Sequence, residues 1–150
     1  MTFTEPMRRA LALAQEAVSD GDVPVGAVVL DVSGQIIGEG RNIRERDGDP
    51  SGHAEIVALR DAAATLGSWR LDDCTLVVTL EPCAMCAGAL VGARISHLVF
   101  GAFDEKAGAV SSVWDLVRDR RLNHRPEVTS GVLADESAEM LRDFFQAERA

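Results

Sequence analysis

The beginning of the chain places apolar residues at the spacing of one helix face, at Met7, Leu11, Ala14 and Val18. Because steps of three and four residues return to the same side of an α-helix, we predict an amphipathic helix here. The same kind of spacing predicts a second helix over about residues 53–66 and a last one that follows Asp135.

Shorter apolar runs predict two strands that pair as a hairpin. Residues 26–31 and 35–39 each hold consecutive branched apolar side chains, and Ser33-Gly34 between them is a turn signal. Residues 41–52 are mostly polar and include glycine and proline, so we predict a loop there.

The centre of the chain alternates between strand and helix signals. Residues 75–80 predict a buried strand, Pro82 opens a helix that continues to about Ala93, and residues 97–101 predict another strand. A strand–helix–strand unit this short favours parallel strands. Residues 111–121 carry a weaker helical pattern. These elements predict one α/β domain over residues 1–150, with three layers, α/β/α, around a mixed sheet of roughly five strands.

The composition agrees with that fold class and bears on the cellular location and the partners of the protein. A chain of 150 residues with 47% hydrophobic and 26% charged residues suits one globular domain. No basic segment followed by an apolar stretch opens the chain, and proline and glycine interrupt the longest apolar run. We therefore expect a cytoplasmic protein without a membrane span. The net charge of -9 does not favour a broadly basic nucleic-acid surface, but a local basic patch can suffice.

Three cysteines and one histidine carry the candidate chemistry. Cys74, Cys83 and Cys86 are odd in number with one close pair, which suits reduced thiols better than a disulfide framework. Cys83 and Cys86 share one face of a predicted helix, and His53 stands at the start of another. Two thiolates and one imidazole, completed by a water, form the ligand pattern of a catalytic zinc site. The sequence thus predicts one Zn²⁺ per chain.

Glu55 lies two residues after the predicted histidine ligand and has a different predicted role. Zinc lowers the pKa of a bound water to about 7, and a nearby carboxylate can move that proton to a ring nitrogen and to leaving ammonia. His-x-Glu with a distant Pro-Cys-x-x-Cys is the pattern of zinc deaminases of nucleobases. A structural metal site and a redox pair are the alternatives. A fourth ligand from Cys74 is disfavoured, because a strand separates it from Cys83 by roughly 20 Å.

The sequence resembles the bacterial tRNA-specific adenosine deaminases of the cytidine deaminase superfamily. The resemblance covers nearly the whole chain and includes His53-Ala54-Glu55-Ile56, Pro82-Cys83-Ala84-Met85-Cys86, Asn123-His124-Arg125 and Asp143-Phe144-Phe145. It implies a cytidine deaminase-like fold, a homodimer with active sites near the subunit interface, and tRNA as partner. The implied reaction is hydrolytic conversion of adenosine to inosine at the wobble position of an arginine tRNA with an ACG anticodon. His53, Cys83 and Cys86 match the zinc ligands of the family, and Glu55 matches its proton shuttle.

The resemblance also implies substrate contacts, each with a simpler alternative. Asn42 matches a residue that hydrogen-bonds the flipped nucleoside, although asparagine after a strand often only completes a turn. Asp104 and Lys106 match a loop that contacts the anticodon backbone, and Asp104 is equally suited to an Asx turn. The residues that match the base pocket are apolar: Val25, Leu80 and Ala102. Such residues are more often plain core.

Several positions depart from the family pattern, among them Gly52 where a small alanine is usual, and two other functions stay open. Phe103 stands where a basic residue is common, and Gln146 and Glu148 stand near the end of the chain where arginines are common. One alternative function is deamination of a free base or nucleoside, such as cytosine, guanine or cytidine. The other is a zinc-stabilised RNA-binding module without turnover, against which Glu55 argues because a structural site needs no such carboxylate.

Overall fold

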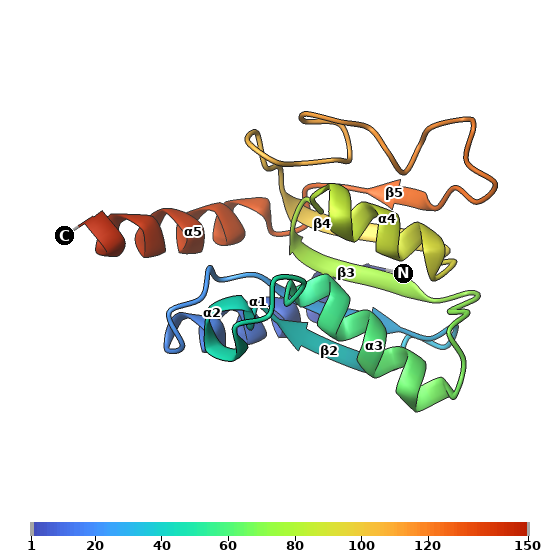
Figure 1. Cartoon of the computed structure of the whole chain (residues 1–150), viewed down its shortest axis with the longest axis horizontal. Coiled ribbons are helices and arrows are strands. Elements are labelled where there is room, and N and C mark those ends of the chain that lie inside the picture. Colours follow the sequence, from blue (N-terminus) through green and yellow to red (C-terminus); the bar gives the residue numbers. More distant parts are fainter. Residues whose placement is uncertain (1, 150) are drawn as a thin grey trace.

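A five-stranded sheet forms the middle layer of the computed structural model, which describes residues 2–149 (Figure 1). In spatial order the strands are β2 (Ile36–Arg41), β1 (Gly26–Leu30), β3 (Thr75–Leu80), β4 (His97–Ala102) and β5 (Glu127–Thr129). β1 pairs antiparallel with β2 and β3, whereas β4 pairs parallel with β3 and β5. The sheet is therefore mixed, as predicted.

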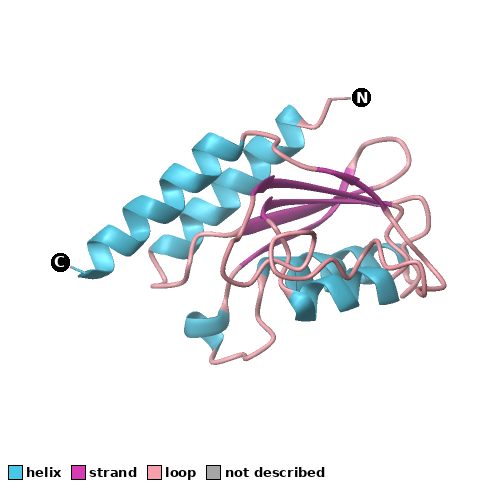
Figure 2. Ribbon diagram, turned by 90° about the horizontal axis from the view of Figure 1, so that it is seen from above, coloured by secondary structure: helices cyan, strands magenta, loops and turns pink. Residues whose placement is uncertain are grey.

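Helices cover both faces of this sheet (Figure 2). They are α1 (Thr4–Val18), α2 (Arg44–Asp47), α3 (Ala54–Leu66), α4 (Ala84–Gly92) and α5 (Ala134–Arg149). The long helices α1 and α5 lie on one face, and α3 and α4 lie on the other. This confirms the predicted three-layer α/β/α architecture. None of the helices within residues 2–149 is both long and apolar enough to cross a membrane.

Side chains alternate between the two faces along each strand and so divide the core in two. Val28 and Val77 pack with Met7 under α1, while Val29 and Val78 belong to the larger cluster under α3 and α4. This alternation follows from the two-residue period of a strand. Because the central strands are buried on both faces, they are apolar at nearly every position, which explains why the sequence pattern identified them.

Two glycines allow β2 to lie unusually close to α3. A Cβ atom on Gly38 would lie 2.5 Å from the carbonyl oxygen of Ala58, and one on Gly40 would lie 2.4 Å from that of Ala54. Any side chain at these positions would push the helix away from the sheet. The close approach fixes the distance between the sheet and the start of α3, where His53 precedes the helix and Glu55 lies in its first turn.

The predicted helix over residues 111–121 is wrong. That stretch contains turns and an isolated bridge between Val110 and Asp115, and Ser111 has a positive φ of 113°. The amide of Leu116 donates to the carbonyl of Ala109 at 2.9 Å, seven positions back, instead of to a carbonyl four positions back. The turn at 108–116 thus takes up an amide that a helix would need.

The predicted loop over residues 41–52 holds two pieces of regular structure. Arg41 still belongs to β2, and Arg44–Asp47 forms the short helix α2. The carboxylate of Asp22, which is 1% exposed, accepts hydrogen bonds from the amides of Glu45 and Arg46 at 2.7 and 3.2 Å. A side chain from outside the segment therefore caps this helix, so its own sequence gives little sign of it.

Replacing Gly40 by alanine is expected to lower the free energy of unfolding by about 1–3 kcal/mol, because an added methyl group overpacks the β2–α3 contact. Urea unfolding measures this change. Gly92→Ala is the control, since a Cβ there meets no atom within 4 Å and alanine is favoured over glycine in a helix. Equal stability of the Gly40 variant and the wild type would contradict the described packing.

Candidate active site

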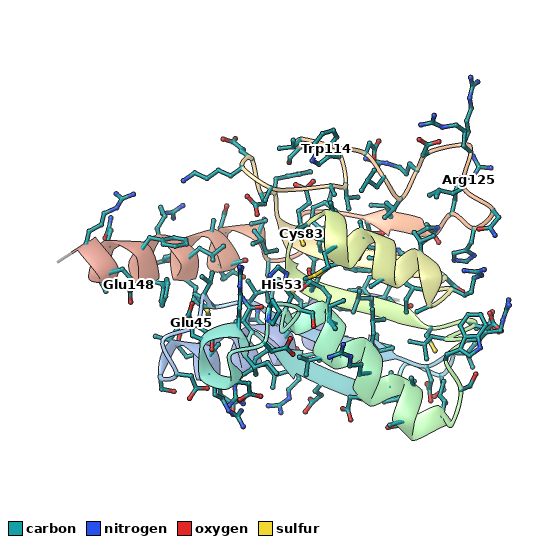
Figure 3. The ribbon with its side chains drawn as sticks, in the orientation of Figure 1. Glu45, His53, Cys83, Trp114, Arg125 and Glu148 are labelled. Atoms are coloured by element: carbon teal, nitrogen blue, oxygen red, sulfur yellow. The ribbon has the colours of Figure 1, made fainter. Side chains whose placement is uncertain are left out.

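The amino-terminal ends of α3 and α4 meet at one end of the sheet and bring three metal-binding side chains together. His53 and Cys83 are the residues that precede α3 and α4, and both have extended backbone. Nδ1 of His53 lies 3.5 Å from Sγ of Cys83 and 3.5 Å from Sγ of Cys86. His53 and Cys83 point toward one another between their helices (Figure 3). The structure thus confirms the convergence that the sequence predicted.

The spacing of these atoms fits zinc. A tetrahedral ion with Zn–N of about 2.0–2.1 Å and Zn–S of about 2.3 Å separates nitrogen from sulfur by about 3.6 Å, and both observed distances are 3.5 Å. Within residues 2–149, the cluster contains these three ligands and no fourth. Three protein ligands leave one coordination position for water or substrate, which is the catalytic arrangement rather than the structural one.

The ionisation of the two thiols also favours a cation. A hydrogen bond from Cys86, together with the nearby His53 ring, lowers the pKa of Cys83 to about 3. The same contact with Cys83, reinforced by burial, raises the pKa of Cys86. One thiol therefore ionises easily, and its negative charge opposes ionisation of the second thiol. A metal ion supplies the positive charge that allows both thiols to ionise.

Glu55 occupies the first turn of α3 and is 4% exposed. Burial raises the pKa of its carboxyl group to about 7, although the neighbouring His53 opposes this. A carboxyl group with a pKa close to neutral both accepts and donates a proton at physiological pH. Its place beside the ligands suits the proton-transfer role predicted for it.

A cavity of about 830 Å³ opens above this cluster. His53, Glu55 and Cys83 lie on its wall beside apolar and polar side chains from several elements: Val25, Asn42, Leu80, Asp104, Phe144 and Phe145. Of the residues matched to the family's base pocket, Val25 and Leu80 line the cavity. Ala102 pairs with Leu80 in the sheet and is 7% exposed, behind that wall.

Asn42 connects the strand layer to the start of α3. Its Nδ2 donates to the carbonyl of Val23 at 2.9 Å, and its Oδ1 accepts from the amide of Ala54 at 2.9 Å. The side chain therefore caps the helix that carries Glu55, and it lines the cavity as well. Both hydrogen bonds join Asn42 to distant segments, so its side chain does not complete a local turn, and its contact with a nucleoside stays a prediction.

Asp104 and Lys106 lie in one loop and share one groove, and Asp104 also reaches the cavity. The Asp104 carboxylate accepts from the amides of Lys106 and Ala107 at 3.1 and 3.2 Å, which is the Asx turn considered from the sequence. Asp104 lines both the cavity and the adjoining groove, and Lys106 lines the groove. The sequence analysis did not single out Glu81, whose buried side chain lies against this loop. The feature that could have pointed to it is a charged residue directly after an apolar strand.

Comparison with known proteins agrees with this geometry. Residues 2–102 match the cytidine and deoxycytidylate deaminase zinc-binding region. The chain belongs to this deaminase family. The matched range includes His53, Glu55 and both cysteines of the metal cluster, so the deaminase is identified by the same residues that form the site.

Individual relatives of the deaminase are close over nearly its whole length. It is 52% identical over 95% of its chain to a tRNA-specific adenosine deaminase of Haemophilus influenzae, of which it covers 83%. It is 56% identical to a tRNA(Ile)-lysidine synthase of Deinococcus radiodurans, but it spans only 24% of that longer protein. A solved structure from a study of A-to-I editing by tRNA:A34 deaminases superimposes with a TM-score of 0.88 at 42% identity, over 92% of this chain and 99% of that one.

The Cys86→Ala variant is expected to lose stoichiometric zinc and to unfold at a lower temperature, because metal binding energy is coupled to folding. Elemental analysis and thermal unfolding measure both effects. Cys74→Ala is the matched control, since Cys74 is equally buried in the core but stands outside the cluster. Wild-type zinc content in the Cys86 variant, or loss of zinc in the control, would contradict the assigned ligands.

Proposed function

We propose that this deaminase converts adenosine to inosine at the wobble position of tRNA, with an arginine tRNA that carries an ACG anticodon as its substrate. The observation that carries this proposal is the cluster of three zinc ligands and Glu55 at the wall of an open cavity. The similarity to tRNA-specific adenosine deaminases selects the substrate class. Such a substrate places the protein in the cytoplasm, where tRNA is modified and used.

The residues of the site divide the chemistry between them. His53, Cys83 and Cys86 would hold Zn²⁺, which would lower the pKa of a water so that hydroxide is available near neutral pH for the deamination. Glu55 takes the proton released from the attacking water and delivers it to the ring nitrogen. It then supports transfer of a proton to the amino group, so the C–N bond breaks and ammonia leaves. One water is consumed, and inosine and ammonia are formed.

The surroundings of the cavity suit a single-stranded RNA loop. A groove of about 700 Å³ adjoins the cavity and is lined by exposed aromatic and basic side chains: Phe103, Phe145, Lys106, Arg142 and Arg149. Aromatic faces stack on unpaired bases, and basic side chains pair with phosphates. An anticodon loop is single-stranded, so its wobble base can leave the stack and enter a cavity at low cost.

The apolar surface of α4 supports the proposed homodimer. Met85 on this helix and Trp114 on the segment between β4 and β5 are 40% and 58% exposed, and Val113 and Leu116 are also exposed. A groove of about 600 Å³ runs along α4 past Gly88, where an added Cβ would meet no atom within 4 Å. An apolar patch of this kind next to an active site is typical of a subunit interface. Because α4 carries Cys86, a partner docked there would lie close to the zinc site.

The Glu55→Gln variant tests the reaction. It is expected to keep its zinc and to form inosine in tRNA about 10²–10⁴-fold more slowly, because the side chain keeps its shape but loses its capacity to transfer protons. Inosine content of digested tRNA and metal analysis measure the two effects. Parallel assays of wild-type protein with free adenine, guanine and cytosine, with ammonia as readout, test the alternative. Activity on free bases without activity on tRNA would contradict the proposed substrate.

The groove beside α5 predicts where added charge improves RNA binding. Gln146 lines the groove with Arg149, so Gln146→Arg is expected to tighten tRNA binding and to steepen the salt dependence by a log–log slope of about 0.7 for one new phosphate contact. Glu148→Arg, at the mouth of the cavity, should add to this effect. Gln15→Arg is the matched control, because Gln15 lines a separate groove between α1 and α5. Equal binding isotherms for the variants at positions 146 and 15 would contradict this placement of the RNA.

A further inference from the structure

Glu81 is a buried carboxylate that the proposed chemistry does not use. It lies between the end of β3 and the ligand Cys83, and it is 2% exposed. A buried carboxylate is costly unless hydrogen-bond donors surround it. The identity of those donors therefore indicates what the residue does.

All of the hydrogen-bond donors to this carboxylate come from one loop. Oε1 accepts from the amide of Asp104 at 2.9 Å and from the hydroxyl of Ser112. Oε2 accepts from the amides of Val110 and Ser112 at 2.9 and 3.0 Å. Hydrogen bonds to an ionised acceptor are stronger than those between neutral groups. One side chain thus organises residues 104–112, which form no helix or strand of their own.

The loop is fitted closely around the carboxylate and against the zinc-binding segment. A Cβ atom on Gly108 would lie 2.3 Å from the carboxyl carbon of Glu81, so only glycine fits there. The amide of Ala109 donates to the carbonyl of Pro82 at 2.8 Å, and the amide of Glu81 donates to that of Ala102 at 2.8 Å. The segment just before Cys83 is therefore attached to this loop through its side chain and through its backbone.

We propose that Glu81 is a positioning residue that sets substrate affinity by holding this loop beside the zinc site. Asp104 and Ala107 line the cavity, and Lys106 lines the adjoining groove. A displaced loop would present these groups in the wrong place to the RNA while His53, Glu55 and the cysteines stay in position. The proposal rests on tRNA as the substrate, and it assigns to Glu81 a role in KM rather than in the chemical step.

The Glu81→Gln variant tests this role, because its amide group places N–H donors against the backbone N–H groups that the carboxylate accepted. We expect zinc content to stay at the wild-type value, KM for tRNA to rise about tenfold or more, and kcat at saturation to change by less than about threefold. Amide hydrogen exchange in residues 104–112 should become faster. Glu127→Gln, an exposed glutamate on β5, is the matched control and should leave KM and exchange unchanged.

Three further substitutions separate a positioning role of Glu81 from a general effect on protein stability. Gly108→Ala should raise KM as Glu81→Gln does, because it forces the loop off an intact carboxylate. In a Glu81→Ala background, which removes the obstructing group, the same change should have little further effect. Ser112→Ala removes one donor and should raise KM by a smaller factor, so it remains informative if the other variants fail to fold.

The outcomes separate this proposal from the proposed function. Unchanged KM and unchanged loop exchange in folded Glu81→Gln or Ser112→Ala protein would overturn it. So would a loss of kcat or zinc with KM unchanged, which would make Glu81 a support of the metal site alone. Wild-type protein that does not act on tRNA would contradict the proposed function, and in that case unchanged exchange in residues 104–112 would still overturn the positioning role of Glu81.

Discussion

The arrangement of the molecule depends on holding two thiolates and one imidazole within 4.8 Å of one another. Neighbouring sulfur atoms oppose each other's ionisation, so a fixed scaffold and a cation are both needed to keep them together. The scaffold is the sheet edge at which α3 and α4 begin. Helix amino termini favour negative charge, and glycines in β2 let α3 lie close enough for its first turn to reach the cysteines.

Three buried carboxylates around this edge show how the environment decides the role of a side chain. Asp22 accepts amides from α2, and Glu81 accepts amides from the loop at 104–112, so both act as anchors for segments of the cavity wall. Glu55 lies beside the metal ligands, and its burial raises its pKa to about 7. Hydrogen bonds to backbone amides stabilise a carboxylate as an anion, while burial keeps its proton within reach of neutral pH. Buried carboxylates with different surroundings thus meet near the ends of α3 and α4, although Asp22, Glu55 and Glu81 come from distant parts of the sequence.

The charge distribution reconciles an acidic chain with the proposed RNA substrate. Several arginines are already paired with carboxylates, such as Arg41 with Asp20 and Arg121 with Asp119. α5 turns acidic residues toward α1, in the groove that contains Glu136 and Glu139, and basic residues toward the loop that contains Lys106. A net charge of -9 is therefore compatible with a groove beside the cavity in which Lys106, Arg142 and Arg149 outnumber Asp104 and Glu105, because short-range charge governs a small footprint.

The sequence by itself determined the α/β class, the central strand–helix–strand unit and the three side chains that are positioned to bind a metal ion, and it predicted a proton-transfer role for Glu55. These follow from short-range rules: periodicity marks buried elements, and a ligand pair three residues apart on a helix must share a face. Only the tertiary structure decided the loop at 104–112, the short helix α2 and the position of β5. Glu81 accepts the amides of Val110 and Ser112 and so holds the loop, and Asp22 caps α2 from a distant segment. Such hydrogen bonds join residues more than 20 positions apart, and no local pattern of hydrophobic and polar residues records them.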